Sequence, residues 1–412
     1  MFKAFRLLIF IMCLPIWMRA QENRSLTEST EPLATDSLEA LLLTCSPGTE
    51  VWQYYGHTAL LIQSKHSGDL VFNYGLFDFR TPNFTWRFIL GETDYTVGHT
   101  SLEHFVEEYQ QRGSAVRAAK LNLSQEEIIR LGGSIMTECM ERGWTYRYNF
   151  FYDNCATRIR DKIEQCIEGE VIYDNDHIPQ LSLRDIIHAY SAPYKWSTFG
   201  QDLLIGAPAD LKADRITQEF APEILEQHLN HAQIKREDGT LSPLITEKRT
   251  IVEGNVTGQI PFKKGLPLSP FACVWILFLI MVVLNMWDRK RRKMSWIFDL
   301  ILLSTQGIMG CIITFMFLFS QHPTVASNAL ILLFNPLPLI FLYWTIKAER
   351  KGRPCLYHTI ALVWITLFFL LSFTIIKQYV SPETYVLALC LLLRSEANTI
   401  ASYRQFKSKN SR

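Results

Sequence analysis

Cys155 stands where a thiol could act as a nucleophile. It follows Asp153 and Asn154, two residue types that favour the position before a helix, so we expect Cys155 to open a helix. There the positive end of the helix dipole and the free backbone N–H groups favour the thiolate. The same N–H groups can bind an oxyanion, so a single turn would supply both a nucleophile and a charge stabiliser.

His57 is the candidate base for this thiol. It follows Gly56 and precedes the apolar run 58–62, a pattern that places it at the start of a strand. An imidazole brought to the thiol would take its proton and complete an activated nucleophile. The sequence therefore predicts a Cys–His pair built from two distant segments.

A third residue is needed to orient the imidazole. Residues 58–63 and 70–74 are predicted to be strands that form a hairpin. In that hairpin His57 pairs roughly opposite Asn73, whose side chain could accept a hydrogen bond from the ring. A shift of the register by one residue would present Tyr74 instead.

Each of these residues alone has a simpler explanation. A histidine at the start of a strand is usually structural, and a buried cysteine usually packs. A second Gly-His-Thr occurs at residues 98–100, where His99 is explained as a loop residue at a helix entrance. The chain has no CxxC, HExxH, P-loop or GxSxG motif, and a His–Cys pair alone is a poor zinc site. We therefore expect neither a metal nor a cofactor.

The first half of the chain is typical of an α+β fold. Globular patterning predicts a domain over 37–206, and 207–266 reads as an extension or linker. Together with the hairpin, the helices predict a helical layer against a small antiparallel sheet. Apolar periodicity and capping patterns predict helices at 101–112, 124–141, from Cys155 onward and at 183–190.

Residues 1–20 read as an export signal. Lys3 and Arg6 precede an apolar run too short to span a bilayer comfortably, and Ala20 is a small residue suited to cleavage. The formal net charge is only +1, and the first half of the chain has no basic stripe interleaved with aromatic residues. This balance argues against nucleic-acid binding.

Residues 267–401 predict a helical membrane domain. Basic residues gather in the first and third connections and in the tail, so the positive-inside rule places these in the cytoplasm and the amino-terminal domain outside. Arg394, Glu396 and Asn398 interrupt the last span. They are interpreted as lying near the cytoplasmic interface, with a polar site inside the bundle as the alternative. The five apolar spans are expected at about 268–287, 296–319, 329–346, 357–376 and 383–400.

A His-bearing strand followed by Asn-Cys at a helix start resembles the circularly permuted papain-like fold of the NlpC/P60 superfamily, which includes the lecithin:retinol acyltransferase-type thiol enzymes. More closely, the chain resembles the Lnb-type bacterial lipoprotein N-acyltransferases, in which an exported domain joins a multi-span membrane domain. The stretches that carry this resemblance are Tyr55-Gly56-His57-Thr58, 73–77, 146–161, 183–185, 199–202, His322-Pro323 with Asn328, and Asn335-Pro336.

The resemblance implies that Cys155 takes an acyl chain from a membrane phospholipid as a thioester, with His57 as the base. The α-amino group of a diacylglyceryl-cysteine lipoprotein then attacks, which gives the triacylated form. Tyr55, Asn154 and Tyr74 are candidates for binding, oxyanion or positioning roles. The resemblance also implies a multi-pass protein of the bacterial inner membrane with its amino-terminal domain in the periplasm.

Three alternatives stay open at this point. A thiol phospholipase differs only in that water accepts the acyl group. A peptidoglycan endopeptidase of the same superfamily uses the same Cys–His pair but has no need of five spans. In a non-enzymatic envelope sensor or assembly factor, Cys155 would form a disulfide with Cys139 or Cys166, and His57 would be structural.

Overall fold

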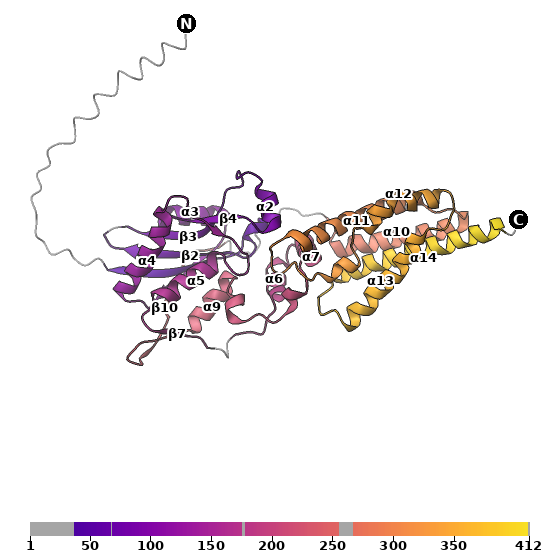
Figure 1. Cartoon of the computed structure of the whole chain (residues 1–412). Coiled ribbons are helices and arrows are strands. Elements are labelled where there is room, and N and C mark those ends of the chain that lie inside the picture. Colours follow the sequence, from indigo (N-terminus) through magenta and orange to yellow (C-terminus); the bar gives the residue numbers. More distant parts are fainter. Residues whose placement is uncertain (1–36, 67, 175–177, 255–266, 411–412) are drawn as a thin grey trace, which may run out of the picture. The chain divides into compact units, whose positions relative to one another are not determined.

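The computed structural model of the chain describes residues 37–66, 68–174, 178–254 and 267–410. The predicted export signal at 1–20 lies outside the described residues. Those described form an α+β domain followed by a helical region, as the sequence predicts (Figure 1).

The α+β domain is built on a seven-stranded sheet with the order β10-β5-β1-β2-β3-β4-β6 (Figure 1). Each pairing in it is antiparallel. The strands are β1 (Leu38–Cys45), β2 (His57–Ser64), β3 (Leu70–Leu76), β4 (Asp94–Ser101), β5 (Val116–Leu121), β6 (Tyr146–Arg147) and β10 (Ile245–Val252). A second, three-stranded sheet consists of β7 (Glu170–Ile172), β8 (Gln233–Lys235) and β9 (Leu241–Pro243).

Helices cover both faces of the large sheet. Side chains alternate between the faces along each strand. Leu42 and Leu60 therefore pack with α4, α5 and α9, while Leu41 and Leu61 pack with α3. The predicted single helical layer on a small sheet is thus too simple. The helices of this domain are α2 (Phe84–Leu90), α3 (Leu102–Arg112), α4 (Gln125–Met140), α5 (Cys155–Cys166), α6 (Leu183–Ser191), α7 (Lys195–Leu204), α8 (Arg215–Gln218) and α9 (Pro222–His231), with 3-10 turns η1 (Val51–Gln53) and η3 (Ala207–Asp210).

Local capping patterns predict the helix starts well. Ser124 and Glu127 form the predicted capping box at the start of α4. Asn154 caps α5, which begins at Cys155 as expected. The hairpin of β2 and β3 also forms.

The segment 207–266 is interpreted from the sequence as an extension or linker, and its described part, 207–254, completes the α+β domain. Strand β10 pairs with β5 along the edge of the large sheet. Leu225 and Leu229 of α9 are fully buried in the core beneath that sheet. These contacts join elements far apart in the chain, so local patterns do not reveal them.

The helical region contains α10 (Pro270–Arg291), α11 (Trp296–Phe319), η4 (Ala329–Leu332), α12 (Leu337–Arg350), α13 (Leu356–Thr374) and α14 (Pro382–Asn410). Among the described residues, four segments are long and apolar enough to cross a membrane: α10, α11, η4 together with α12, and α13. The fifth predicted span falls within α14, which is not one of the four.

Arg394 explains part of this difference. Its side chain is almost fully buried and makes ion pairs with Asp288 of α10 (2.9 Å) and with Asp299 of α11. Asn398 is buried beside it and donates to Asp299. The side chains of Arg394 and Asn398 therefore face neighbouring helices and do not extend toward solvent. Their partners Asp288 and Asp299 lie at the helix ends next to the basic connection 289–293, and the position near the cytoplasmic interface stays a prediction.

Candidate functional site

Asn154 fixes the start of α5. Its side-chain oxygen accepts hydrogen bonds from the backbone N–H groups of Ala156 (2.9 Å) and Thr157 (3.0 Å). Its amide nitrogen donates to the backbone oxygens of Phe150 (3.0 Å) and Phe220 (2.8 Å). Because both ends of the buried amide are occupied, Asn154 serves as a positioning residue for the helix start.

Cys155 lies at this helix start, is partly exposed and interacts with His57. Burial raises the pKa of the Cys155 thiol. The charge of His57, a hydrogen bond with its ring, and the backbone N–H groups of Thr58 and Ala156 lower that pKa. These contributions outweigh burial, so the pKa of Cys155 lies below its ordinary value. Burial lowers the pKa of His57, yet Cys155 and a hydrogen bond to Asn73 raise it above its ordinary value. Together these shifts favour a thiolate beside an imidazolium.

Asn73 holds the imidazole from the other side. Its Oδ1 lies 3.1 Å from Nε2 of His57, which leaves Nδ1 as the ring nitrogen for Cys155. The strand register differs from the predicted one, since Leu60 pairs with Phe72 and Asn73 is therefore offset from His57 by two positions. The two side chains still share a face of the sheet and meet as diagonal neighbours.

Gly56 lets the chain enter β2 at the correct place for His57. Its φ of +77° lies in the left-handed region, which glycine adopts without strain. A Cβ at this position would lie only 2.3 Å from the backbone oxygen of Cys45. Cys45 is the β1 residue that pairs with His57, so this close approach belongs to the strand pairing that positions His57.

Gly75 lies next to both Cys155 and Tyr146. A Cβ on Gly75 would lie 3.8 Å from Cβ of Cys155 and 3.9 Å from the hydroxyl oxygen of Tyr146. That hydroxyl is buried and has no hydrogen-bond partner among the described residues. Burial raises the pKa of Tyr146, and the nearby Cys155 raises it further, so the phenol stays protonated. A protonated phenol near a thiolate, with its O–H not used by the protein, is a candidate donor to a substrate carbonyl oxygen.

Two tyrosines that the sequence analysis named occupy other positions. Tyr55 is buried among aromatic rings, with ring centroids 4.8 Å from Phe150 and 6.1 Å from Phe220. Tyr74 is fully buried, and its hydroxyl donates to Glu138 (2.5 Å). Tyr55 therefore packs against aromatic rings next to the start of α5. Tyr74 bonds to Glu138 and does not contact His57.

The sequence patterns did not identify Tyr146 or Gly75 as individual site residues. Tyr146 lies in β6, a two-residue strand that pairs with β4 at the sheet edge, and no local pattern predicts so short an element. Gly75, with φ of +88°, did offer a signal. A glycine inside a strand pattern often marks a close approach of the backbone to another group.

The remaining candidates do not join the site. His99 lies in β4, where its ring meets that of Phe72 at 6.3 Å. Every cysteine of the described residues is free, so no disulfide involves Cys155 there. Burial raises the pKa of the Cys45 thiol to about 12, which keeps it inert. Within the described ranges, no group of three His, Cys, Asp or Glu side chains is arranged to hold a metal ion.

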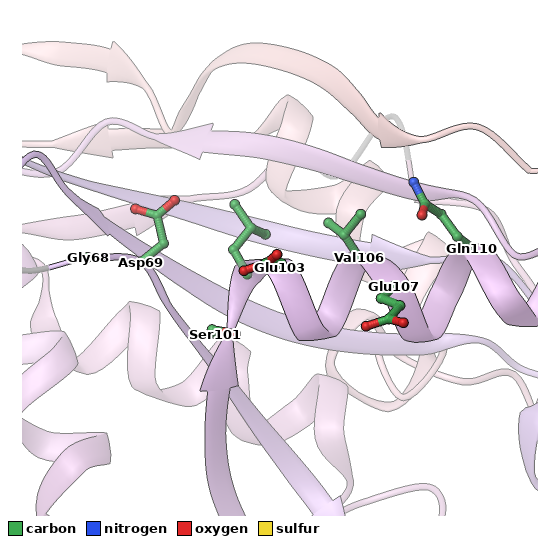
Figure 2. Close-up of a pocket in the computed structure, with 8 residues that line it drawn as sticks. Gly68, Asp69, Ser101, Glu103, Val106, Glu107 and Gln110 are labelled. Carbon is green, nitrogen blue, oxygen red and sulfur yellow. The ribbon is translucent and has the colours of Figure 1, made fainter.

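A surface depression of about 880 Å³ lies elsewhere, between the loop before β3 and helix α3 (Figure 2). Asp69, Glu103 and Glu107 give it an acidic lining. It lies beside α3, on the face of the sheet opposite the core that α5 packs against. None of the residues that interact with Cys155 lines this depression, so it is separate from the candidate site.

Comparisons with known proteins give two matches, one for each half of the chain. Residues 26–189 match a family model described as the Lnb N-terminal periplasmic domain. Residues 262–406 match one described as the Lnb transmembrane domain. The searches of curated proteins and of solved structures found no match. The papain-like permutation of the fold stays a prediction.

Proposed function

Because the chain belongs to the Lnb family of lipoprotein N-acyltransferases, we propose that its periplasmic domain uses Cys155 to move an acyl chain from a membrane phospholipid to the α-amino group of a lipoprotein. The observation that carries this proposal is the partly exposed thiol at the start of α5, in contact with His57, which Asn73 holds. No metal or cofactor is needed for this chemistry.

In the first half-reaction, the Cys155 thiolate attacks the carbonyl carbon of a phospholipid ester. The carbon–sulfur bond forms and the carbonyl oxygen becomes an oxyanion, which the O–H of Tyr146 and the backbone N–H of Cys155 stabilise. The ester carbon–oxygen bond then breaks, and the imidazolium of His57 gives its proton to the leaving alkoxide. The products are a lysophospholipid and a thioester on Cys155.

In the second half-reaction, the α-amino group of a diacylglyceryl-cysteine lipoprotein attacks the thioester. The carbon–nitrogen bond forms, the carbon–sulfur bond breaks, and neutral His57 takes the proton that the amine loses. The pair of thiolate and imidazolium is restored. Asn73 is a positioning residue in both steps, because its hydrogen bond to Nε2 keeps Nδ1 aimed at the sulfur.

The membrane region supports the same reaction through its topology. Both substrates are lipids or lipid-anchored, so a tethered catalyst meets them at a high effective concentration. The periplasmic domain and the basic connection 289–293 after α10 lie on opposite ends of that helix, which agrees with the positive-inside rule for an inner-membrane protein. We extend the proposal to α14 as a fifth crossing that returns the basic tail to the cytoplasm.

The test measures the acylation state of a reporter lipoprotein in cells that lack their own N-acylation and express this chain. Mass spectrometry of the N-terminal lipopeptide is expected to show the triacyl form. In the Cys155→Ala and His57→Ala variants the transfer rate is expected to fall by on the order of 10³ or more at equal protein level. Cys139→Ala, which removes another partly exposed thiol, serves as the control and keeps activity.

Two results would contradict the proposal. If Cys155→Ala still yields the triacyl lipoprotein, the thioester route is wrong. If the wild-type protein consumes phospholipid but releases only free fatty acid, water is the acceptor and the chain is a phospholipase.

A further inference from the structure

Several large apolar side chains are exposed on the segments around the site, among them five from Trp52 of η1 to Phe88 of α2. Each leaves between 43% and 58% of its surface open to solvent, although large exposed apolar groups that gather on one surface usually contact a partner or a lipid. We call this set the apolar stripe, and its members are Trp52, Leu76, Phe79, Trp86 and Phe88.

One end of the apolar stripe lies against a membrane helix. The ring of Trp86 in α2 lies 5.0 Å from the ring of Phe315 in α11, one turn before that helix ends at Phe319. Ser320 donates a hydrogen bond to the backbone oxygen of Ile89 (2.8 Å), which fastens α2 to this end of α11. Since α11 is long and apolar enough to span a membrane, we expect Trp86, beside the last turn of that helix, to lie near the bilayer surface, where tryptophan is enriched.

Ring contacts continue from α2 toward the site. Phe88 stacks on Phe84, with ring centroids 6.4 Å apart, and Phe84 meets Phe79 at 5.2 Å. Phe79 in turn contacts Trp52 at 5.4 Å. Ring contacts therefore run from Phe88 of α2 to Trp52, in the segment that precedes His57, and Trp86 of the same helix contacts α11.

The other end of the apolar stripe approaches Cys155 through aromatic rings. Phe79 meets Phe77, with ring centroids 4.8 Å apart, and Phe77 meets Tyr95 at 4.9 Å. Tyr95 stacks on Tyr148 at 4.1 Å, and Tyr148 is close enough to Cys155 for the two groups to interact electrostatically.

Ion pairs neutralise much of the charge next to the apolar stripe. Asp78 and Arg80, which flank Phe79, make an ion pair with each other (3.1 Å). Arg87 of α2 and Arg147 of β6 both pair with Asp94 (2.6 and 2.8 Å), so this cluster keeps one positive charge. A positive charge at this place is compatible with a phospholipid headgroup, which carries a phosphate.

We propose that the apolar stripe carries one acyl chain of the donor phospholipid from the bilayer to Cys155. This inference rests on the proposed function. The donor chain is the occupant because it is attached to the reacting carbonyl, so its first methylene groups must lie beside the sulfur, whereas the chains of the lipoprotein are several bonds away from its reacting amine. Methylene groups that leave the bilayer are costly to expose to water, and an apolar surface continuous with the membrane removes that cost.

The test follows formation of the hydroxylamine-labile acyl group on Cys155 in the full-length protein, held in phospholipid nanodiscs without an acceptor. The paired variants Trp52→Ser/Phe79→Ser and Trp86→Ser/Phe88→Ser are compared with Ile129→Ser, an equally exposed apolar residue on α4. Each pair is expected to slow acylation by about tenfold or more, and the Ile129→Ser variant is expected to match the wild type. Alkylation of Cys155 by iodoacetamide, read by mass spectrometry of its peptide, reports whether the site of each variant is folded.

The outcomes separate this inference from the proposed function. If the wild type itself forms no acyl-enzyme, the proposed function fails. If the wild type is acylated and the folded variants are acylated equally fast, the stripe does not carry the donor chain, although the proposed function stands. If acylation is unchanged and only transfer to a diacylglyceryl lipopeptide slows, the stripe serves the acceptor, which also overturns the inference.

Discussion

At the residue scale, His57 decides the ionisation of Cys155. Burial alone would raise the pKa of this thiol, and the neighbouring ring reverses the direction of that shift. Asn73 contributes indirectly, because its hydrogen bond holds the ring and raises the pKa of His57. In the proposed mechanism the thiolate is therefore present before any substrate arrives, which suits an acyl transfer at neutral pH.

This balance predicts the pH dependence of Cys155 alkylation. In the wild type the pKa of Cys155 is lowered, so the thiolate forms below the ordinary thiol range and iodoacetamide reacts already at neutral pH. In His57→Ala the two largest contributions that oppose burial are lost and only the backbone N–H groups of Thr58 and Ala156 remain, so the pKa rises and alkylation at pH 7 is expected to fall by about tenfold or more. An unchanged pH profile in this variant would contradict the role of His57.

Tyr146→Phe is the matched control for that experiment. It removes only the hydroxyl near Cys155 and leaves His57 in place. The alkylation profile is therefore expected to stay as in the wild type, while acyl transfer slows by about 10²–10³ because an oxyanion donor is lost. If both readouts change together, the hydroxyl supports the structure of the site rather than the oxyanion.

At the element scale, the start of α5 depends on one capping side chain. Asn154→Ala removes two hydrogen bonds to the helix and leaves two backbone oxygens without their donor, so the free energy of unfolding is expected to fall by about 1–3 kcal/mol. Ser124→Ala removes the equivalent cap of α4, away from the site, and is expected to cost about 1 kcal/mol.

Thermal unfolding of the two variants, together with Cys155 alkylation, checks this prediction. Only Asn154→Ala is expected to change the alkylation rate, since only α5 presents the thiol. Equal alkylation in both variants would mean that the strands alone position Cys155.

Local sequence was enough to predict the starts of α4 and α5, but not the contacts between distant strands. Helix starts at Gln125 and Cys155 follow from capping residues within the same turn, so local sequence was sufficient. The meeting of His57 with Asn73 was predicted for the right strands but in a register two positions away. Tyr146 could not be predicted, because its position depends on the pairing of β6 with β4, which joins segments distant in the chain.

At the scale of the whole molecule, α14 packs with the apolar helices although its length and composition do not mark it as a membrane span. A hydropathy average treats each side chain as if it faced lipid. Arg394 instead faces Asp288 and Asp299, and α14 packs against α10 and α13. A charge that other helices neutralise is tolerated inside a bundle, although it makes the segment look unsuited to a membrane.

Arg394→Leu is therefore expected to destabilise the helical region, although it raises the hydropathy of α14. The substitution makes α14 more apolar, yet it leaves the buried carboxylates of Asp288 and Asp299 without their main countercharge, so the helical region is expected to lose about 3–5 kcal/mol of stability. Thermal unfolding in nanodiscs measures this loss, with Arg404→Leu as the control because Arg404 is an exposed arginine of the same helix. The triple variant that adds Asp288→Asn and Asp299→Asn removes the unpaired charges and is expected to recover much of the stability.

If Arg394→Leu is as stable as Arg404→Leu, the ion pairs do not hold α14 in the bundle, and the proposed fifth crossing loses its physical basis.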